Sequence, residues 1–146
     1  DGNPKTYKFT KPKVDGLNFS FSGLKTNILY FIQKKVAENE NFIAENLNDI
    51  CASIQYTIIE ILMDKLKLAV AETGINQITI GGGVSANSGI RNTLKEAESK
   101  YGWKTYIPKF EYTTDNAAMI GIVGYYNFLE ENFSTADVVS KARIEF

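Results

Sequence analysis

ITIGGGVSANSGIRNTL, residues 78–94, places a strand, a run of glycines and the start of a helix in immediate succession. Isoleucines on either side of Thr79 are typical of a strand. The glycines at 81–83 allow positive φ angles and a close approach of a ligand to bare main chain. Asn87 or Ser85 can cap the following helix, whose first N–H groups and positive dipole end suit an anion such as phosphate. A tight βα turn that serves packing alone is the alternative.

Before the glycines we predict a strand and two helices. Alternating apolar residues predict a half-buried strand over 17–21. An apolar stripe then predicts a helix over about 24–38, with Ser22 as its cap. The longest helix is predicted over 47–73, where apolar residues recur every three or four positions, and Gly74 is expected to end it.

The predicted helix over 47–73 is amphipathic and should form part of the core. Ser53 and Thr57 fall on its polar side, opposite the apolar stripe. Cys51 falls in the apolar pattern, so a buried reduced thiol is expected rather than a nucleophile. A single cysteine excludes a disulfide framework and suits the cytoplasm.

After the glycines we predict a surface helix, a strand and a buried helix. The surface helix should end at Gly102, with Arg91 turned outward. A strand is predicted over 103–107. A pair of threonines then precedes a helix over about 115–131 that is apolar nearly all round, so this helix should be buried.

Composition limits the classes of function. With 146 residues and 44% apolar content the chain can bury one sizeable core, so a single domain over 1–146 is expected. A net charge of −1 argues against a strong nonspecific grip on nucleic acid. The chain has no histidine, which excludes a Ser/His/Asp triad or a histidine metal cage from these residues alone. Any acid–base or metal role falls to carboxylates. No apolar run approaches the length of a membrane span, and no leader pattern opens the chain, so we expect no membrane contact.

Residues 1–16 are predicted to be a connector, with one edge strand near 7–9. The segment contains two glycines, two prolines and four lysines, at positions 5, 8, 11 and 13. These lysines can either contact phosphate or form a solvated face.

Asp115 is the candidate acid of the predicted site. The order of elements is α/β in kind, and in such folds ligands bind at the carboxyl ends of strands. Asp115 follows a predicted strand and begins a predicted helix, where the dipole favours its charged form. It is therefore either a helix cap or a cation ligand. Asn116 can cap the helix or bind a ligand instead.

Three segments taken together resemble the TsaD family: FSFSGLKT at 19–26, GGGVSAN at 81–87 and TDNAAMIG at 114–121. This family comprises the threonylcarbamoyl-transferring subunits of tRNA modification, formerly described as O-sialoglycoprotein endopeptidases or M22 glycoproteases. The chain resembles the C-terminal portion of the bacterial type. The absence of an initial methionine agrees with a longer parent protein.

The resemblance implies an actin-like ATPase fold, shared with sugar kinases, chaperone ATPases and actin, of which this chain would be the C-terminal lobe with a mixed sheet and flanking helices. It implies transfer of the acyl group of threonylcarbamoyl-AMP to the exocyclic amine of the adenosine 3′ of the anticodon. Implied partners are tRNA and the bacterial proteins TsaB and TsaE.

Site residues carry over position by position. Asn87 matches the asparagine that contacts the adenylate or ATP, and Gly82, Gly83 and Ser85 belong to the same binding segment. Asp115 matches a catalytic aspartate that binds one divalent metal, iron or zinc, together with two histidines of an HxxxH motif. That motif and its N-terminal lobe are absent from these residues. We therefore expect the chain alone to fold, to lack a complete metal site and to be inactive.

Three other functions remain open at this point. A glycine turn before a helix also occurs in other actin-like ATPases and kinases, although a TDNAAM segment argues against them. A noncatalytic interaction module could use the long helix as an interface. The older metalloprotease description finds no HExxH zinc helix in this sequence.

Overall fold

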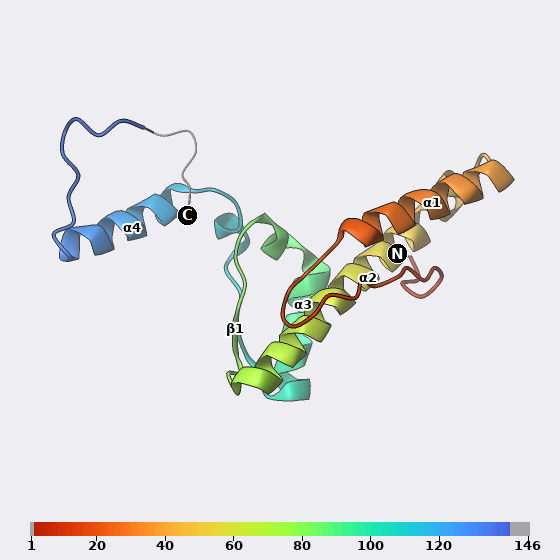
Figure 1. Cartoon of the computed structure of the whole chain (residues 1–146), viewed down its shortest axis with the longest axis horizontal. Coiled ribbons are helices and arrows are strands. Elements are labelled where there is room, and N and C mark those ends of the chain that lie inside the picture. Colours follow the sequence, from red (N-terminus) through yellow and green to blue (C-terminus); the bar gives the residue numbers. More distant parts are fainter. Residues whose placement is uncertain (1, 141–146) are drawn as a thin grey trace.

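The computed structural model describes residues 2–140. Within this range the molecule is an elongated set of helices with one small sheet, and a single helix projects from one end (Figure 1). In chain order the elements are α1 (Ser22–Glu38), α2 (Phe42–Thr73), β1 (Gln77–Thr79), the 3-10 helix η1 (Gly83–Ala86), α3 (Ser88–Tyr101), β2 (Lys104–Tyr106), the 3-10 helix η2 (Phe110–Tyr112) and α4 (Ala117–Leu129).

The two longest helices, α1 and α2, lie side by side as a hairpin (Figure 1). Gly74 ends α2 with a left-handed φ of 69°, as predicted. The start of α2 was predicted too late, because the helix begins at Phe42. The cap predicted for α1 was wrong, because Ser22 is already helical and the N-cap is Phe21, which makes no side-chain cap bond.

The N-terminal segment packs along α2 but forms no strand over 7–9. Its backbone N–H groups bond to helix side chains, since Tyr7 N donates to Ser53 Oγ at 3.1 Å and Asn3 N donates to Asp49 Oδ1 at 2.8 Å. Phe9 is buried against Leu24 and Ile61. The segment is therefore a packed part of the core rather than a free connector.

This packing overturns the predicted polar side of α2. Ser53 is 0% exposed and Thr57 is 5% exposed, because the N-terminal segment covers them. Both hydroxyls are hydrogen-bonded, since Thr57 Oγ1 donates to the carbonyl of Ser53 at 2.9 Å and Ser53 Oγ donates to the carbonyl of Asn3 at 3.4 Å. Cys51, which was predicted to be buried, is exposed. Cys51 follows buried Ile50, and successive residues of a helix are rotated by about 100°, so its side chain points away from the side that buries Ile50.

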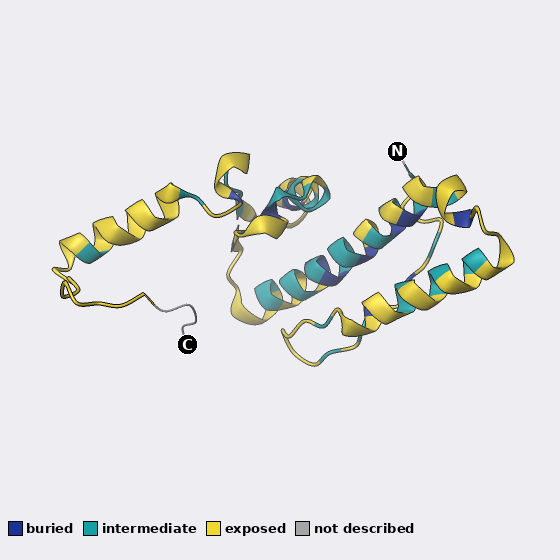
Figure 2. Cartoon of the chain, turned by 90° about the horizontal axis from the view of Figure 1, so that it is seen from above, coloured by how far each residue is buried: buried dark blue, intermediate teal, exposed yellow. Residues whose placement is uncertain are grey.

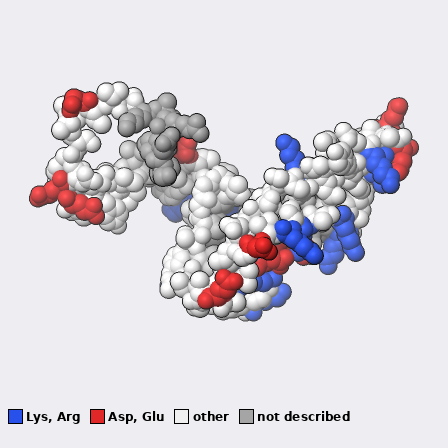
Figure 3. Space-filling model, in the orientation of Figure 1, with Lys and Arg blue, Asp and Glu red and all other residues white. Residues whose placement is uncertain are grey.

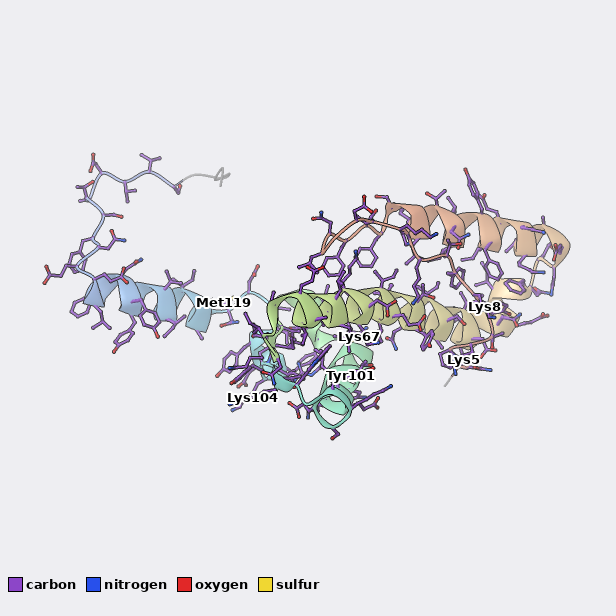
Figure 4. All side chains as sticks on the ribbon, turned by 60° about the horizontal axis from the view of Figure 1, so that its bottom comes forward. Lys5, Lys8, Lys67, Tyr101, Lys104 and Met119 are labelled. Atoms are coloured by element: carbon purple, nitrogen blue, oxygen red, sulfur yellow. The ribbon has the colours of Figure 1, made fainter. Side chains whose placement is uncertain are left out.

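The lysines of the N-terminal segment lie mostly in solvent. Lys11 forms ion pairs with Asp64 at 2.8 Å and Glu60 at 3.2 Å. The hydrogen bond to Asp64 raises the pKa of Lys11. Lys5 and Lys8 are exposed at the far end of α2 from Lys67 and Tyr101 (Figure 4).

The sheet consists of β1 and β2, which pair in parallel with Gln77 opposite Lys104 and Thr79 opposite Tyr106. Both strands were predicted. Among residues 2–140 the sheet is purely parallel, so the mixed sheet that was expected is not found there. A buried core supports it, made by Met63 of α2, Ile78 of β1, Leu94 and Ala97 of α3, and Trp103 just before β2.

The predicted strand over 17–21 is absent, because these residues are irregular up to the start of α1. Its apolar side chains are partly in solvent, with Leu17 39% and Phe19 49% exposed. A strand needs a neighbour to satisfy its backbone, and β1 pairs only with β2 in the described part of the chain.

Helix α4 has no buried residue, and all of its residues except Asn127 are exposed, contrary to the prediction that the helix is buried (Figure 2). It has no Asp, Glu, Lys or Arg, and Ile120 is 77% and Phe128 65% exposed. Lys and Arg side chains lie instead mainly over the part of the molecule that α1, α2 and α3 form, where Asp and Glu side chains also lie (Figure 3). None of the helices in the described residues is long and apolar enough to cross a bilayer.

Candidate functional site: the loops after the two parallel strands

The candidate site is formed by two loops that leave the same edge of the sheet. β1 leads into residues 81–87, which we call the glycine elbow, and β2 leads into residues 107–116, which we call the Asp115 loop. Because β1 and β2 are parallel and in register, both loops leave from the carboxyl ends of the strands. Ligands bind at this edge in open α/β sheets.

The glycine elbow presents bare main chain. Gly82 has a φ of 76°, so it needs a glycine. Gly81 and Gly83 have no positive φ, so of the three glycines only Gly82 uses the conformational freedom that the sequence suggested for all of them. A Cβ atom added at any of the three would meet no atom within 4 Å. The space in front of this backbone is therefore free for a ligand.

Ser85 stabilises the turn rather than α3. Its Oγ donates to the carbonyl of Gly82 at 2.7 Å, and its backbone N–H donates to the same oxygen at 2.9 Å. The residue is only 3% exposed. Its hydroxyl hydrogen is used in the turn, so in this conformation Ser85 Oγ can meet a ligand only as an acceptor.

Asn87 caps α3, which confirms one of the two caps predicted for this helix, Asn87 or Ser85. Its Oδ1 accepts from Ile90 N at 3.0 Å, and its Nδ2 donates to Gln55 Oε1 of α2 at 3.1 Å. These two bonds fix the orientation of the amide. One Nδ2 hydrogen and one Oδ1 lone pair remain for a ligand.

Close packing of α3 on α2 brings Gln55 to the elbow. A Cβ atom at Gly89 would lie 2.8 Å from Ile59 Cδ1 and 2.9 Å from Gln55 Nε2. Glycine at this position therefore permits the contact that holds Asn87. Gln55 could not be predicted from sequence, because its partner Asn87 lies 32 positions away.

Arg91, which was predicted to point outward, reaches back to both loops. Its Nη1 donates to the carbonyl of Ser85 at 2.9 Å and its Nη2 to the carbonyl of Pro108 at 2.7 Å. One sequence signal could have revealed it. A cation in the first turn of a helix opposes the helix dipole, so another interaction must hold it there.

Asp115 does not cap α4, because Asn116 does. Asn116 Oδ1 accepts from Met119 N at 3.2 Å, and its Nδ2 donates to the carbonyl of Thr114 at 2.8 Å. Asp115 is exposed one position before this cap. The capping interpretation of Asp115 is therefore wrong, and its ligand role stays a prediction.

The described residues do not form a metal site. Within residues 2–140 no group of three or more His, Cys, Asp or Glu side chains is placed to hold an ion. Asp115 would be a single carboxylate ligand, and the chain has no histidine to complete the set. No hydrogen bond joins Asp115 to the glycine elbow among these residues.

An apolar groove of about 710 Å³ opens beside the elbow, between α1, α2 and α3. Its polar groups include Lys25 and Asn87. The remaining lining is apolar, including Leu24, Ile28, Ile58 and Leu62. A groove of this size and lining suits a small organic ligand.

These features define an α/β protein with a glycine-rich loop at the carboxyl edge of a parallel sheet. The sequence model of TsaD, described as tRNA N6-adenosine threonylcarbamoyltransferase, matches residues 1–122. The chain belongs to the TsaD family.

Relatives with that same description cover nearly the whole chain. One from Christiangramia forsetii is 63% identical over 146 residues, which are 100% of this chain and 43% of the relative. A relative from Riemerella anatipestifer is 51% identical over 99% of this chain and 42% of the relative. Another, from Phocaeicola vulgatus, is 50% identical over 98% of this chain and 42% of the relative. The chain thus spans less than half the length of these relatives.

Proposed function

We propose that this chain is part of a tRNA-modifying transferase, which moves a threonylcarbamoyl group from threonylcarbamoyl-AMP to the adenosine 3′ of the tRNA anticodon. The observation that supports this most is the family match over residues 1–122, which includes the glycine elbow and the Asp115 loop. The longer relatives supply the name of the activity, so the proposal concerns the whole protein.

The reaction requires positioning more than covalent help from the protein. The exocyclic amine of adenosine attacks the carbamoyl carbon, a C–N bond forms, the bond from that carbon to the phosphate oxygen breaks, and AMP leaves. The amine loses one proton. Its nitrogen is a weak nucleophile, so the two substrates must be held in reactive alignment and the anionic leaving group must be bound.

The elbow residues are proposed to bind the adenylate. Gly82 and Gly83 would admit the phosphate to bare backbone at the start of η1, and the N-terminal end of α3 that follows would favour the anion through its dipole. Asn87 would donate its free Nδ2 hydrogen, held in place by Gln55. Ser85 would act through the turn that it closes.

Asp115 is proposed to be a catalytic residue and one ligand of a divalent metal, iron or zinc, whose other ligands lie outside these residues. Two observations support the proposal: Asn116 caps α4, and Asp115 is exposed in a loop that leaves the sheet at the same edge as the elbow. The chain alone offers too few ligands for this ion, so we expect it to be inactive by itself.

The proposal also includes the type of fold and the partners of the protein. We propose that the chain is one domain, the C-terminal lobe of an actin-like ATPase fold, and that it works with tRNA, TsaB and TsaE in the cytoplasm. The TsaD match is consistent with such a fold. It also favours a transferase over a kinase, a metalloprotease or a noncatalytic module.

The test is transfer to tRNA by the full-length protein, measured as threonylcarbamoyladenosine by nucleoside mass spectrometry. Asp115→Asn should lower transfer by roughly 100-fold or more and lower the metal content measured by elemental analysis. Glu111→Gln, an exposed carboxylate nearby, is the matched control and should change neither. An inactive wild-type protein with its partners present would overturn the proposed function. An Asp115→Asn protein with normal metal and rate would overturn only the role of Asp115.

A further inference from the structure

Arg91 connects two loops that the chain otherwise holds apart. The sheet links β1 and β2 as far as the bond from Ile80 N to the carbonyl of Tyr106, at 3.2 Å. Beyond that point the elbow and the Asp115 loop follow separate paths, the first into α3 and the second into η2. Among the hydrogen bonds of residues 2–140, the two from Arg91 are those that join the loops beyond the sheet.

The guanidinium group suits this connection for geometric reasons. Its planar fork offers donors on two nitrogens, and here each nitrogen serves a carbonyl from a different loop. The carbonyl of Ser85 lies in the short 3-10 helix η1 and that of Pro108 in irregular backbone, and both need partners when they are partly covered. A lysine ammonium is a compact point charge on a flexible stem, so it would not reproduce the two bonds in a fixed geometry.

We propose that Arg91 is a positioning residue that fixes the glycine elbow relative to the Asp115 loop. The inference rests on the proposed function, because it assigns the adenylate to one loop and the catalytic carboxylate to the other. Arg91 contacts neither substrate in this account. It holds the carbonyl of Ser85, while the glycine backbone of the elbow keeps open space beside it.

The structure predicts how a loss of this connection would appear. Without Arg91 each loop keeps its own internal bonds, such as Ser85 Oγ to Gly82 and Thr113 Oγ1 to the carbonyl of Phe110. The loops would therefore remain folded but move relative to one another. A misplacement of about 1 Å between reacting groups can lower a rate by roughly 100-fold.

The experiment compares Arg91→Met, Arg91→Lys and the control Lys95→Met in the full-length protein. Lys95 is exposed one turn further along α3. Steady-state kinetics give kcat and the KM for threonylcarbamoyl-AMP, well below the melting temperature of each variant. Hydrogen exchange is measured by mass spectrometry over residues 81–87 and 107–116, with the core of α2 as the reference.

We expect Arg91→Met to lower kcat by roughly 10- to 100-fold, with a smaller change in KM, and to speed exchange in both loops while the α2 core stays protected. Arg91→Lys should recover only part of kcat, and Lys95→Met should behave as the wild type. Unchanged kinetics in Arg91→Met, to within about twofold, would overturn the proposal. So would faster exchange spread evenly over the core, since that indicates a general stabilising role.

The exchange measurement separates this proposal from the proposed function. If the wild-type protein transferred nothing to tRNA, the proposed function would fail, yet faster exchange in both loops of Arg91→Met would still support the connection. If the wild type were active and both loops of Arg91→Met exchanged as in the wild type, Arg91 would lose its role while the proposed function remained.

Discussion

Replacing Asn87 by alanine and by aspartate separates its role in stabilising α3 from its proposed role in binding the adenylate. Alanine removes the cap to Ile90 N and the bond to Gln55. The cap is worth about 1 kcal/mol. The partly exposed bond to Gln55 adds about 0.5 kcal/mol. We expect the free energy of unfolding to fall by about 1.5 kcal/mol, which is roughly tenfold in the folding equilibrium.

Aspartate keeps the cap and changes the binding group. Its carboxylate can accept from Ile90 N, and the positive end of the α3 dipole favours the charge. We expect its free energy of unfolding to lie within about 0.5 kcal/mol of the wild type. The Nδ2 donor is lost and a negative charge faces the proposed phosphate. The Kd for an adenylate analogue should therefore rise by roughly tenfold or more.

Urea denaturation and calorimetry with a nonreactive adenylate analogue, both on the full-length protein, measure the two effects. The expected pattern is a stable aspartate variant that binds poorly and an alanine variant that is weaker in both respects. An aspartate variant that binds the analogue as tightly as the wild type would contradict the proposed binding role, and Asn87 would then be a helix cap alone.

Two further predictions concern packing. Ser53→Ala should leave Tyr7 N without its buried acceptor, which costs about 1–3 kcal/mol of folding free energy. It should also expose residues 3–10 to limited proteolysis, whereas Ser22→Ala, at an exposed serine, should not. Equal digestion of the two variants would contradict this prediction. The 146-residue chain should self-associate through the exposed apolar surface of α4. Ile120→Lys should therefore raise the monomer fraction in sedimentation more than Ile75→Lys, a control at an exposed residue outside α4. Equal effects of the two lysines would show that α4 is not the contact.

Local signals predicted the parts of the fold that depend on neighbours in sequence. The glycines at 74 and 102 ended their helices as predicted, and Asn87 began α3. Patterns whose outcome depends on distant segments were misjudged. Ser53 is buried by a segment 46 positions away, and no periodicity within α2 could reveal that cover.

The site divides in the same way. The elbow could be predicted because a strand, glycines and a cap adjoin in sequence, and the structure keeps them adjacent. The contacts of Arg91 and Gln55 could not be predicted, because their partners lie in other elements. For Asp115 the sequence left capping and ligand binding open, and one bond, from Met119 N to Asn116, decided against capping.

Helix α4 makes the placement of Asp115 depend on more than these residues. A helix that is apolar on every side is normally covered on more than one face. None of the residues of α4 is buried in this structure. The relatives of the chain carry more than half of their length outside the part that this chain matches. Asp115 stands two positions before the first helical residue, Ala117, and the cap at Asn116 couples it to the helix axis. We therefore expect the segment that covers α4 in the whole protein also to set the position of this carboxylate, while Arg91 sets the position of the loop that leads to it.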